Sequence, residues 1–180
     1  MHHIRHVISS TVVLFLVVTA VAKPHIKEYR TSYCAFRYPA DFKPSVTDLS
    51  TTFHLALINR SKYWENTITI RKLNKKTEEC DIPQDSHPDT DEKRKIAGHR
   101  AYGYSGEDAA MNRYTKEQGY LIETRTDCWR FELVRQGRPY QKLNLPSEEM
   151  KRLDKQSDQD SKKANVAFKM VLDSFAFRRK

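Results

Sequence analysis

Cysteine, histidine and acidic side chains of this chain are of the types that support thiol chemistry. Cys128, His99 and Asp108 together provide the nucleophile, the base and the orienting acid that a thiol hydrolase requires. No local signature surrounds Cys128, and a cysteine of an exported protein more often forms a disulfide than acts as a nucleophile. We therefore predict no catalytic site, and we keep a secreted hydrolase-like enzyme with a Cys/His thiol centre at these three residues as an alternative.

A second group of side chains has the composition of a metal site. Asp85, His87, Asp89 and Asp91 alternate within the polar stretch 74–95, and carboxylates with histidine can ligate a divalent cation. The stretch lacks the glycine and the distal glutamate of a calcium loop, and a run of acidic residues is more often a solvated loop. We predict no metal and no cofactor, with a divalent-metal carrier as an alternative function.

The chain contains three cysteines, of which two can pair in an oxidising compartment. Cys34 lies in an alternating pattern with Phe36 and Tyr38, which indicates a buried thiol. Cys80 lies in the polar stretch, and Cys128 begins a strand pattern. Of the three possible pairings we expect Cys80 with Cys128, because this bridge would join the polar stretch to the sheet.

Arginines interleave with aromatic residues between residues 125 and 135. Arg125, Arg130 and Arg135 alternate with Trp129 and Phe131, in a protein of net charge +9. A basic surface attracts anionic partners, although a sheet with one apolar face and one solvated face produces the same pattern. We expect these arginines to form a basic edge that contacts a partner protein or an anionic envelope surface, and we expect no nucleic acid.

Residues 1–22 have the three parts of a secretory signal. A basic head over 2–6 precedes an apolar stretch over 7–18, and the small residues Ala20 and Ala22 follow. The unbroken apolar core, 12–18, is shorter than the ~20 residues needed to cross a bilayer. We expect cleavage after Ala22, a secreted or periplasmic protein, one domain over 23–180, and no transmembrane segment after cleavage.

The strand patterns lie between the signal and residue 135. Alternating apolar residues predict strands over 33–38, 52–58, 65–73, 99–104, 120–126 and 128–134. A tight hairpin around Asp127 would join the last two strands. We expect residues 74–95 to form a long polar loop, and the residues Gly106 to Asp108 to break the strand that begins at residue 99.

The last third of the chain has helical character. One helix is expected to begin at Ser147, and a stronger one to run over 159–174 behind a cap at Ser157 or Asp158. The second helix has an apolar stripe that should face the core; it consists of Ala164, Ala167, Phe168, Val171 and Phe175. Five or six strands with a closing helix indicate an α+β sandwich whose sheet is mainly antiparallel.

Two motifs at the ends of this region point to a known fold. The segment Phe36 to Phe42, FRYPADF, resembles the opening of proteins with the PsbP-like fold, and Val171 to Phe177, VLDSFAF, is similar to their closing helix and tail. The resemblance implies a central antiparallel sheet flanked by helices, an α/β/α sandwich, in a superfamily of largely non-catalytic binding and assembly factors. We therefore predict an exported binding or assembly protein, with the polar stretch and the basic edge as contact regions.

Overall fold

The computed structural model describes residues 25–47, 52–57, 61–73, 80–110, 113–140 and 143–178, with the side chains of residues 47, 90–93 and 110 left out. The expected signal over 1–22 lies outside the described residues, as do residues 74–79 of the polar stretch. Among the described residues, no helix combines the length and the apolar character that crossing a bilayer requires.

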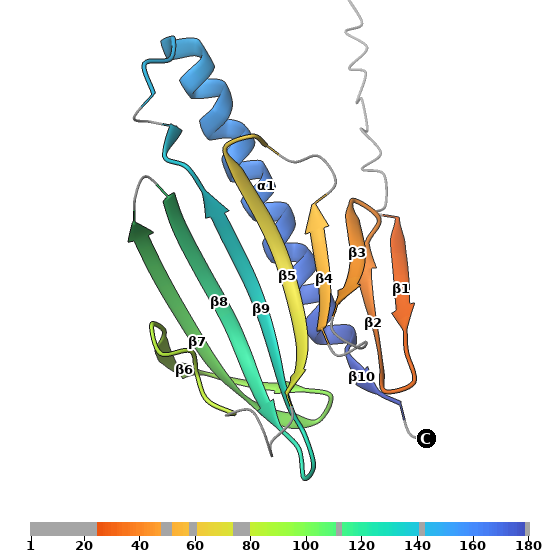
Figure 1. The fold of residues 1–180 in the computed structure, drawn as a ribbon. Coiled ribbons are helices and arrows are strands. Elements are labelled where there is room, and N and C mark those ends of the chain that lie inside the picture. Colours follow the sequence, from red (N-terminus) through yellow and green to blue (C-terminus); the bar gives the residue numbers. More distant parts are fainter. Residues whose placement is uncertain are drawn as a thin grey trace, which may run out of the picture.

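Two antiparallel sheets and one helix make up the described fold (Figure 1). The small sheet has the order β1-β2-β10 and consists of β1 (Ile26–Arg30), β2 (Cys34–Pro39) and β10 (Ala176–Phe177). The large sheet has the order β3-β4-β5-β9-β8-β7-β6 and consists of β3 (Phe42–Thr47), β4 (Thr52–Leu57), β5 (Trp64–Leu73), β6 (His87–Ile96), β7 (His99–Ala110), β8 (Arg113–Glu123) and β9 (Cys128–Gly137). The predicted α+β class with a mainly antiparallel sheet is confirmed.

The helix α1 (Ser147–Ser174) packs on β2, β5 and β9, and the core lies between the helix and these strands. Because side chains alternate along a strand, every second residue of β9 faces the helix, and these residues include Trp129 and Phe131. The predicted apolar stripe meets them, with Phe175 edge-on to Phe131 at 4.8 Å between ring centroids. Each buried side chain of this size contributes roughly 1.5–3 kcal/mol. We call this helix-facing side of the large sheet the inner face.

The expectation of two C-terminal helices was wrong, because α1 is continuous over 28 residues. Ser157 and Asp160, which lie where a helix start was expected, are buried on the inner side of α1. The indole Nε1 of Trp64 donates to Asp160 at 3.1 Å, and the guanidinium of Arg135 donates to Ser157. These tertiary hydrogen bonds satisfy polar groups that would otherwise compete with the helix backbone.

The second half of the polar stretch and the segment Gly106 to Asp108 belong to strands, which corrects two further expectations. β6 occupies His87–Ile96 within the expected loop, and β7 continues through Gly106 to Ala110. β6 pairs with β7 in a register that shifts between Asp89 and Arg94. An edge strand exposes most of its side chains, and charged residues on it protect the sheet from further pairing. Polarity is therefore compatible with a strand at this position.

The hairpin expected around Asp127 is confirmed. β8 ends at Glu123 and β9 begins at Cys128, with the turn held by side-chain and backbone hydrogen bonds. The backbone N–H of Asp127 donates to Thr124 Oγ1 at 3.0 Å, and Thr124 Oγ1 donates to the Asp127 carbonyl at 2.9 Å. This hairpin places Cys128 beside the segment that contains Cys80.

Candidate functional site

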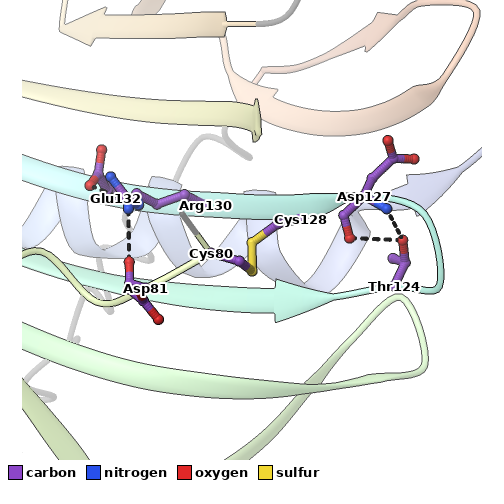
Figure 2. Close-up of a disulfide and its surroundings, with 7 residues drawn as sticks. All are labelled: Cys80, Asp81, Thr124, Asp127, Cys128, Arg130 and Glu132. Atoms are coloured by element: carbon purple, nitrogen blue, oxygen red, sulfur yellow. Dashed lines mark hydrogen bonds and ion pairs between the residues drawn. A yellow bond between two sulfur atoms is a disulfide. The ribbon is translucent and has the colours of Figure 1, made fainter. Parts of the chain in front are cut away.

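The structure joins Cys80 and Cys128 in a disulfide with a Cα–Cα distance of 5.9 Å (Figure 2). Cys34 is the free cysteine and is fully buried, as expected from its strand pattern. Burial raises the pKa of the Cys34 thiol, which disfavours the reactive thiolate form. Neither sulfur of the disulfide is available as a nucleophile in this state.

The proposed thiol centre is not assembled. His99 begins β7 and Asp108 lies nine positions later on the same strand, which separates their Cα atoms by about 30 Å at roughly 3.3 Å per residue. The ring of His99 instead packs edge-on against Phe177 at 5.4 Å between centroids. With Cys128 in the disulfide, the alternative of a Cys/His/Asp centre is contradicted by the geometry.

The four candidate metal ligands do not converge either. Asp85 precedes β6, whereas His87 and Asp89 are successive residues on the same face of β6. Residues two apart on a strand are about 6.6 Å apart and point to the same face, but Asp85 lies on a different segment from this pair. Within the described ranges, no three His, Cys, Asp or Glu side chains are placed to hold a metal ion. The side chain of Asp91 lies outside the description.

The three arginines do not form one surface, which corrects the expected basic edge. Arg125 is exposed in the hairpin turn. Arg130 and Arg135 both belong to β9, but their odd separation places them on opposite faces of the sheet. Arg135 is on the inner face, where its guanidinium bonds Ser157 and Ser161 of α1. Arg130 is on the other side, which we call the outer face.

Residues 80–86, which we call the strap, are attached to the outer face at several points. The Cys80–Cys128 disulfide fixes one end, and Arg130 Nη2 donates to the carbonyl of Asp81 at 2.8 Å (Figure 2). At the other end, the hydroxyl of Ser86 donates to Glu117. These contacts fix the strap to the outer face, where Arg130 Nε is a buried donor without a hydrogen-bond partner among the described residues.

Tyr104 occupies the outer face next to the strap. Its hydroxyl donates to Glu132 Oε1 at 2.9 Å, and burial together with the Glu132 charge raises the pKa of this phenol. The ring approaches β8 at Gly119, where a Cβ atom would lie 2.4 Å from the ring. Glycine at this position is therefore required by close packing.

The inner face contains a cavity with a volume of about 450 Å³, a groove between α1 and the strands β7 and β8. Four of its lining residues form one row across four strands. Asn66 of β5 lies opposite Arg135 of β9, which lies opposite Lys116 of β8, which lies opposite Glu107 of β7. Side chains in such directly opposed positions have Cβ atoms about 4.5–5.5 Å apart. The row therefore brings three hydrogen-bond donors and one carboxylate into the same groove.

A second cavity, of about 330 Å³, continues along the helix. Ser105, Gln118 and Asn165 line both cavities. Gln118 Nε2 donates to Asn165 Oδ1 at 2.7 Å, so this hydrogen bond connects β8 to α1 where the two cavities adjoin. The groove between helix and sheet is thus elongated and polar, in contrast to the aromatic core beside it.

Arg135 is held in place by neutral groups. Its Nε donates to the hydroxyl of Tyr114 at 3.3 Å, its two Nη atoms donate to the serines of α1, and its guanidinium lies 5.7 Å from the Trp64 ring centroid. In the part of the chain that the structure describes, no carboxylate lies within 4.0 Å of this guanidinium. The positive charge of Arg135 is therefore positioned but not neutralised.

Asn66 is the second unusual group in the groove. Its side chain is only 3% exposed, and its Nδ2 has no hydrogen-bond partner among the described residues. Such orphaned groups are rare, because a buried donor without an acceptor costs about 1–3 kcal/mol. Sequence reasoning missed Asn66, since one asparagine in an alternating strand has no distinguishing signal. It identified Arg135, but as part of a solvated surface.

Comparisons with known proteins identify a similar solved structure and no family. No family model and no curated protein matches the chain. A solved structure, the crystal structure of LpqN involved in cell envelope biogenesis of Mycobacterium tuberculosis, is similar with a TM-score of 0.47 and 11% sequence identity. The similarity covers 86% of this chain and 92% of LpqN. At this level it assigns neither a family nor a function to the chain.

Proposed function

We propose that this chain is an exported, non-catalytic binding protein whose ligand occupies the groove between α1 and strands β7 and β8. The observation that carries the proposal is the orphaned amide of Asn66, which is buried in the wall of a 450 Å³ cavity. A ligand that presents an acceptor to Nδ2 would remove the cost of this unsatisfied donor. Ligand cavities commonly have volumes of about 300–1,000 Å³, so the groove suits a small molecule.

Two features support export. The Cys80–Cys128 disulfide is typical of an oxidising compartment, and the pattern over 1–22 is that of a cleaved signal. We include in the proposal cleavage after Ala22, a secreted or periplasmic location, and the PsbP-like relationship indicated by the FRYPADF and VLDSFAF motifs. Binding and assembly roles are common in that superfamily, which agrees with a non-catalytic function.

The groove replaces the basic edge as the proposed contact region. Binding of an anionic surface through Arg125, Arg130 and Arg135 would require these side chains to share a face, and they do not. The strap, which belongs to the polar stretch, is engaged with the outer face through its own hydrogen bonds. The inner face combines the unsatisfied Asn66 Nδ2 with a cavity of about 450 Å³, so a ligand in that cavity can supply the missing acceptor.

The proposal is tested by blocking the groove with one bulky side chain. Ser105 is exposed and lines both cavities from the inner face of β7, so Ser105→Trp should occlude the groove without disturbing the core. Asp108→Trp is the matched control, because Asp108 is an exposed residue on the outer face of the same strand.

A panel of small polar compounds is then screened by thermal shift on the full exported protein and on both variants. We expect at least one compound that raises the melting temperature of the wild type and of Asp108→Trp but not of Ser105→Trp, since a ligand stabilises only the state that binds it. Hits that stabilise Ser105→Trp equally, or a panel without hits, would count against the groove as the binding site.

A further inference from the structure

The groove has a charge pattern that specifies the kind of ligand, beyond the presence of a cavity. We infer that the row formed by Asn66, Arg135 and Lys116 binds an oxyanion, a carboxylate or phosphate group, of a ligand whose remainder lies along the groove towards Gln118 and Asn165. This inference rests on the proposed function and names its substrate class.

The first step of the argument is the arginine. The hydrogen bonds from Arg135 to Tyr114, Ser157 and Ser161 use three of the five guanidinium N–H groups. The remaining N–H groups can serve a bound group, and a fixed guanidinium is suited to the bidentate recognition of carboxylate and phosphate. Because its existing partners are neutral, the guanidinium retains its full charge for the ligand.

The second step is the position of the other two donors. Asn66 and Lys116 lie directly opposite Arg135 on its two neighbouring strands, so all three donors line the same section of the groove. The Asn66 Nδ2 lacks an acceptor, and the positive charge of Arg135, which has neutral partners, favours an anion. A single oxyanion meets both requirements, whereas a neutral hydroxyl would meet only the first.

The third step concerns the acidic groups of the groove. Glu107 forms an ion pair with Lys116 at 2.7 Å, with both side chains more than half exposed, and such pairs are weak. Glu117 accepts a hydrogen bond from Ser86 of the strap. His87 also lines the cavity and lies on the edge strand β6. In the described part of the chain, Arg135 is hydrogen-bonded to Tyr114, Ser157 and Ser161 and to none of these groups. An incoming anion therefore competes only with the solvent-screened pair of Lys116 and Glu107.

The test uses NMR titration of the full exported protein with acetate, with inorganic phosphate and with glucose as a neutral probe. The signals to follow are the Asn66 side-chain amide and the Arg135 Nε–H. We expect saturable shifts of both signals with an anionic probe and none with glucose at equal concentration. Acetate and phosphate differ in shape and charge, so their relative affinities distinguish a carboxylate ligand from a phosphate ligand.

Two variants make the inference falsifiable. Asn66→Asp is nearly isosteric and places a carboxylate opposite Arg135, where it should raise the melting temperature and weaken anion binding more than about tenfold, because like charges repel. Lys116→Gln should weaken binding by about two- to fivefold, the range expected for one exposed charge. Arg113→Gln is the matched control, since it removes the same charge from an exposed residue on the outer face of β8.

The outcomes separate this inference from the proposed function. Anion binding retained in Asn66→Asp, or weakened equally by Lys116→Gln and Arg113→Gln, would overturn the oxyanion site. Stronger binding of glucose than of either anion would overturn it as well, yet it would leave the groove as the binding site if Ser105→Trp abolishes that binding. Loss of anion binding in Ser105→Trp and Asn66→Asp, with Asp108→Trp unaffected, supports both.

Discussion

The disulfide between the strap and β9 should contribute a large part of the stability of this protein. It links Cys80 to Cys128 across a sequence separation of 48 residues. The perturbation is the double substitution Cys80→Ala and Cys128→Ala, which removes the link and avoids leaving a buried hydroxyl. Cys128 packs with Leu73 and Leu121 in a small apolar cluster, so alanine is compatible with its surroundings.

The size of the effect follows from the length of the closed loop. In the chain-entropy model, a link across 48 residues lowers the entropy of the unfolded chain enough to contribute about 4 kcal/mol at 25 °C. For a domain of this size, each kcal/mol changes the melting temperature by roughly 2–4 °C. We therefore expect the double variant to melt about 8–16 °C below the wild type.

Urea unfolding measures the corresponding free energy directly. Trp64 and Trp129 are both buried, so their fluorescence should report unfolding of the sheet. The urea concentration at the unfolding midpoint should be lower for the double variant than for the wild type. A reductant should lower the midpoint of the wild type to that of the variant. It should leave the midpoint of the variant unchanged. Since the disulfide lies on the outer face, ligand affinity in the groove should be unchanged at temperatures where the variant is folded.

A loss of less than about 1 kcal/mol would refute the reasoning. It would mean either that the link is not formed in solution or that the unfolded chain remains compact around the strap. A thiol count on the unfolded, unreduced wild type separates these explanations, because a formed link leaves one reactive thiol.

Three further predictions concern single positions. Gly119→Ala should destabilise the protein by at least about 1–3 kcal/mol in urea unfolding, because its Cβ would lie 2.4 Å from the Tyr104 ring and 2.7 Å from the Phe131 carbonyl oxygen; wild-type stability would show that the ring can move away. Wild-type stability should fall as the pH rises above 10, since the unfolded phenol loses a proton that burial and Glu132 retain on Tyr104 in the native state by raising its pKa. The stability of Tyr104→Phe should fall less steeply above pH 10 than that of the wild type in the same assay. An equally steep fall in both proteins would assign the effect to other groups. Cys34 should resist alkylation in the native protein and react once the protein is unfolded, because it is fully buried and its pKa is raised; mass spectrometry that found rapid native labelling would contradict this burial.

Local sequence patterns were sufficient for much of the fold. The alternation around Cys34 indicated a buried strand, the stripe from Ala164 to Phe175 indicated a core-facing helix, and the turn at Asp127 indicated a hairpin; all three are present. These features depend on residues close together in the chain. Their period of two or 3.6 residues already specifies which face must be buried.

Polar segments were misjudged because their conformation depends on distant partners. β6 is a strand because its backbone pairs with β7 at the edge of the sheet, where polar side chains remain solvated. The helix α1 continues through Ser157 because the guanidinium of Arg135, 22 residues earlier, donates to its hydroxyl. A window of neighbouring residues contains neither interaction.

The sequence by itself determined the class of the fold, the buried free thiol and the preference for a Cys80–Cys128 link, since composition and short-range periodicity carry that information. Only the tertiary structure decided which side chains meet. Strand pairing placed Asn66 opposite Arg135, although the two are 69 positions apart in the chain, and the packing of α1 enclosed them in a groove. A binding site depends on such long-range neighbours, because a ligand interacts with the charges and hydrogen-bonding groups that lie close together in space. The positions of these groups along the chain do not affect the interaction.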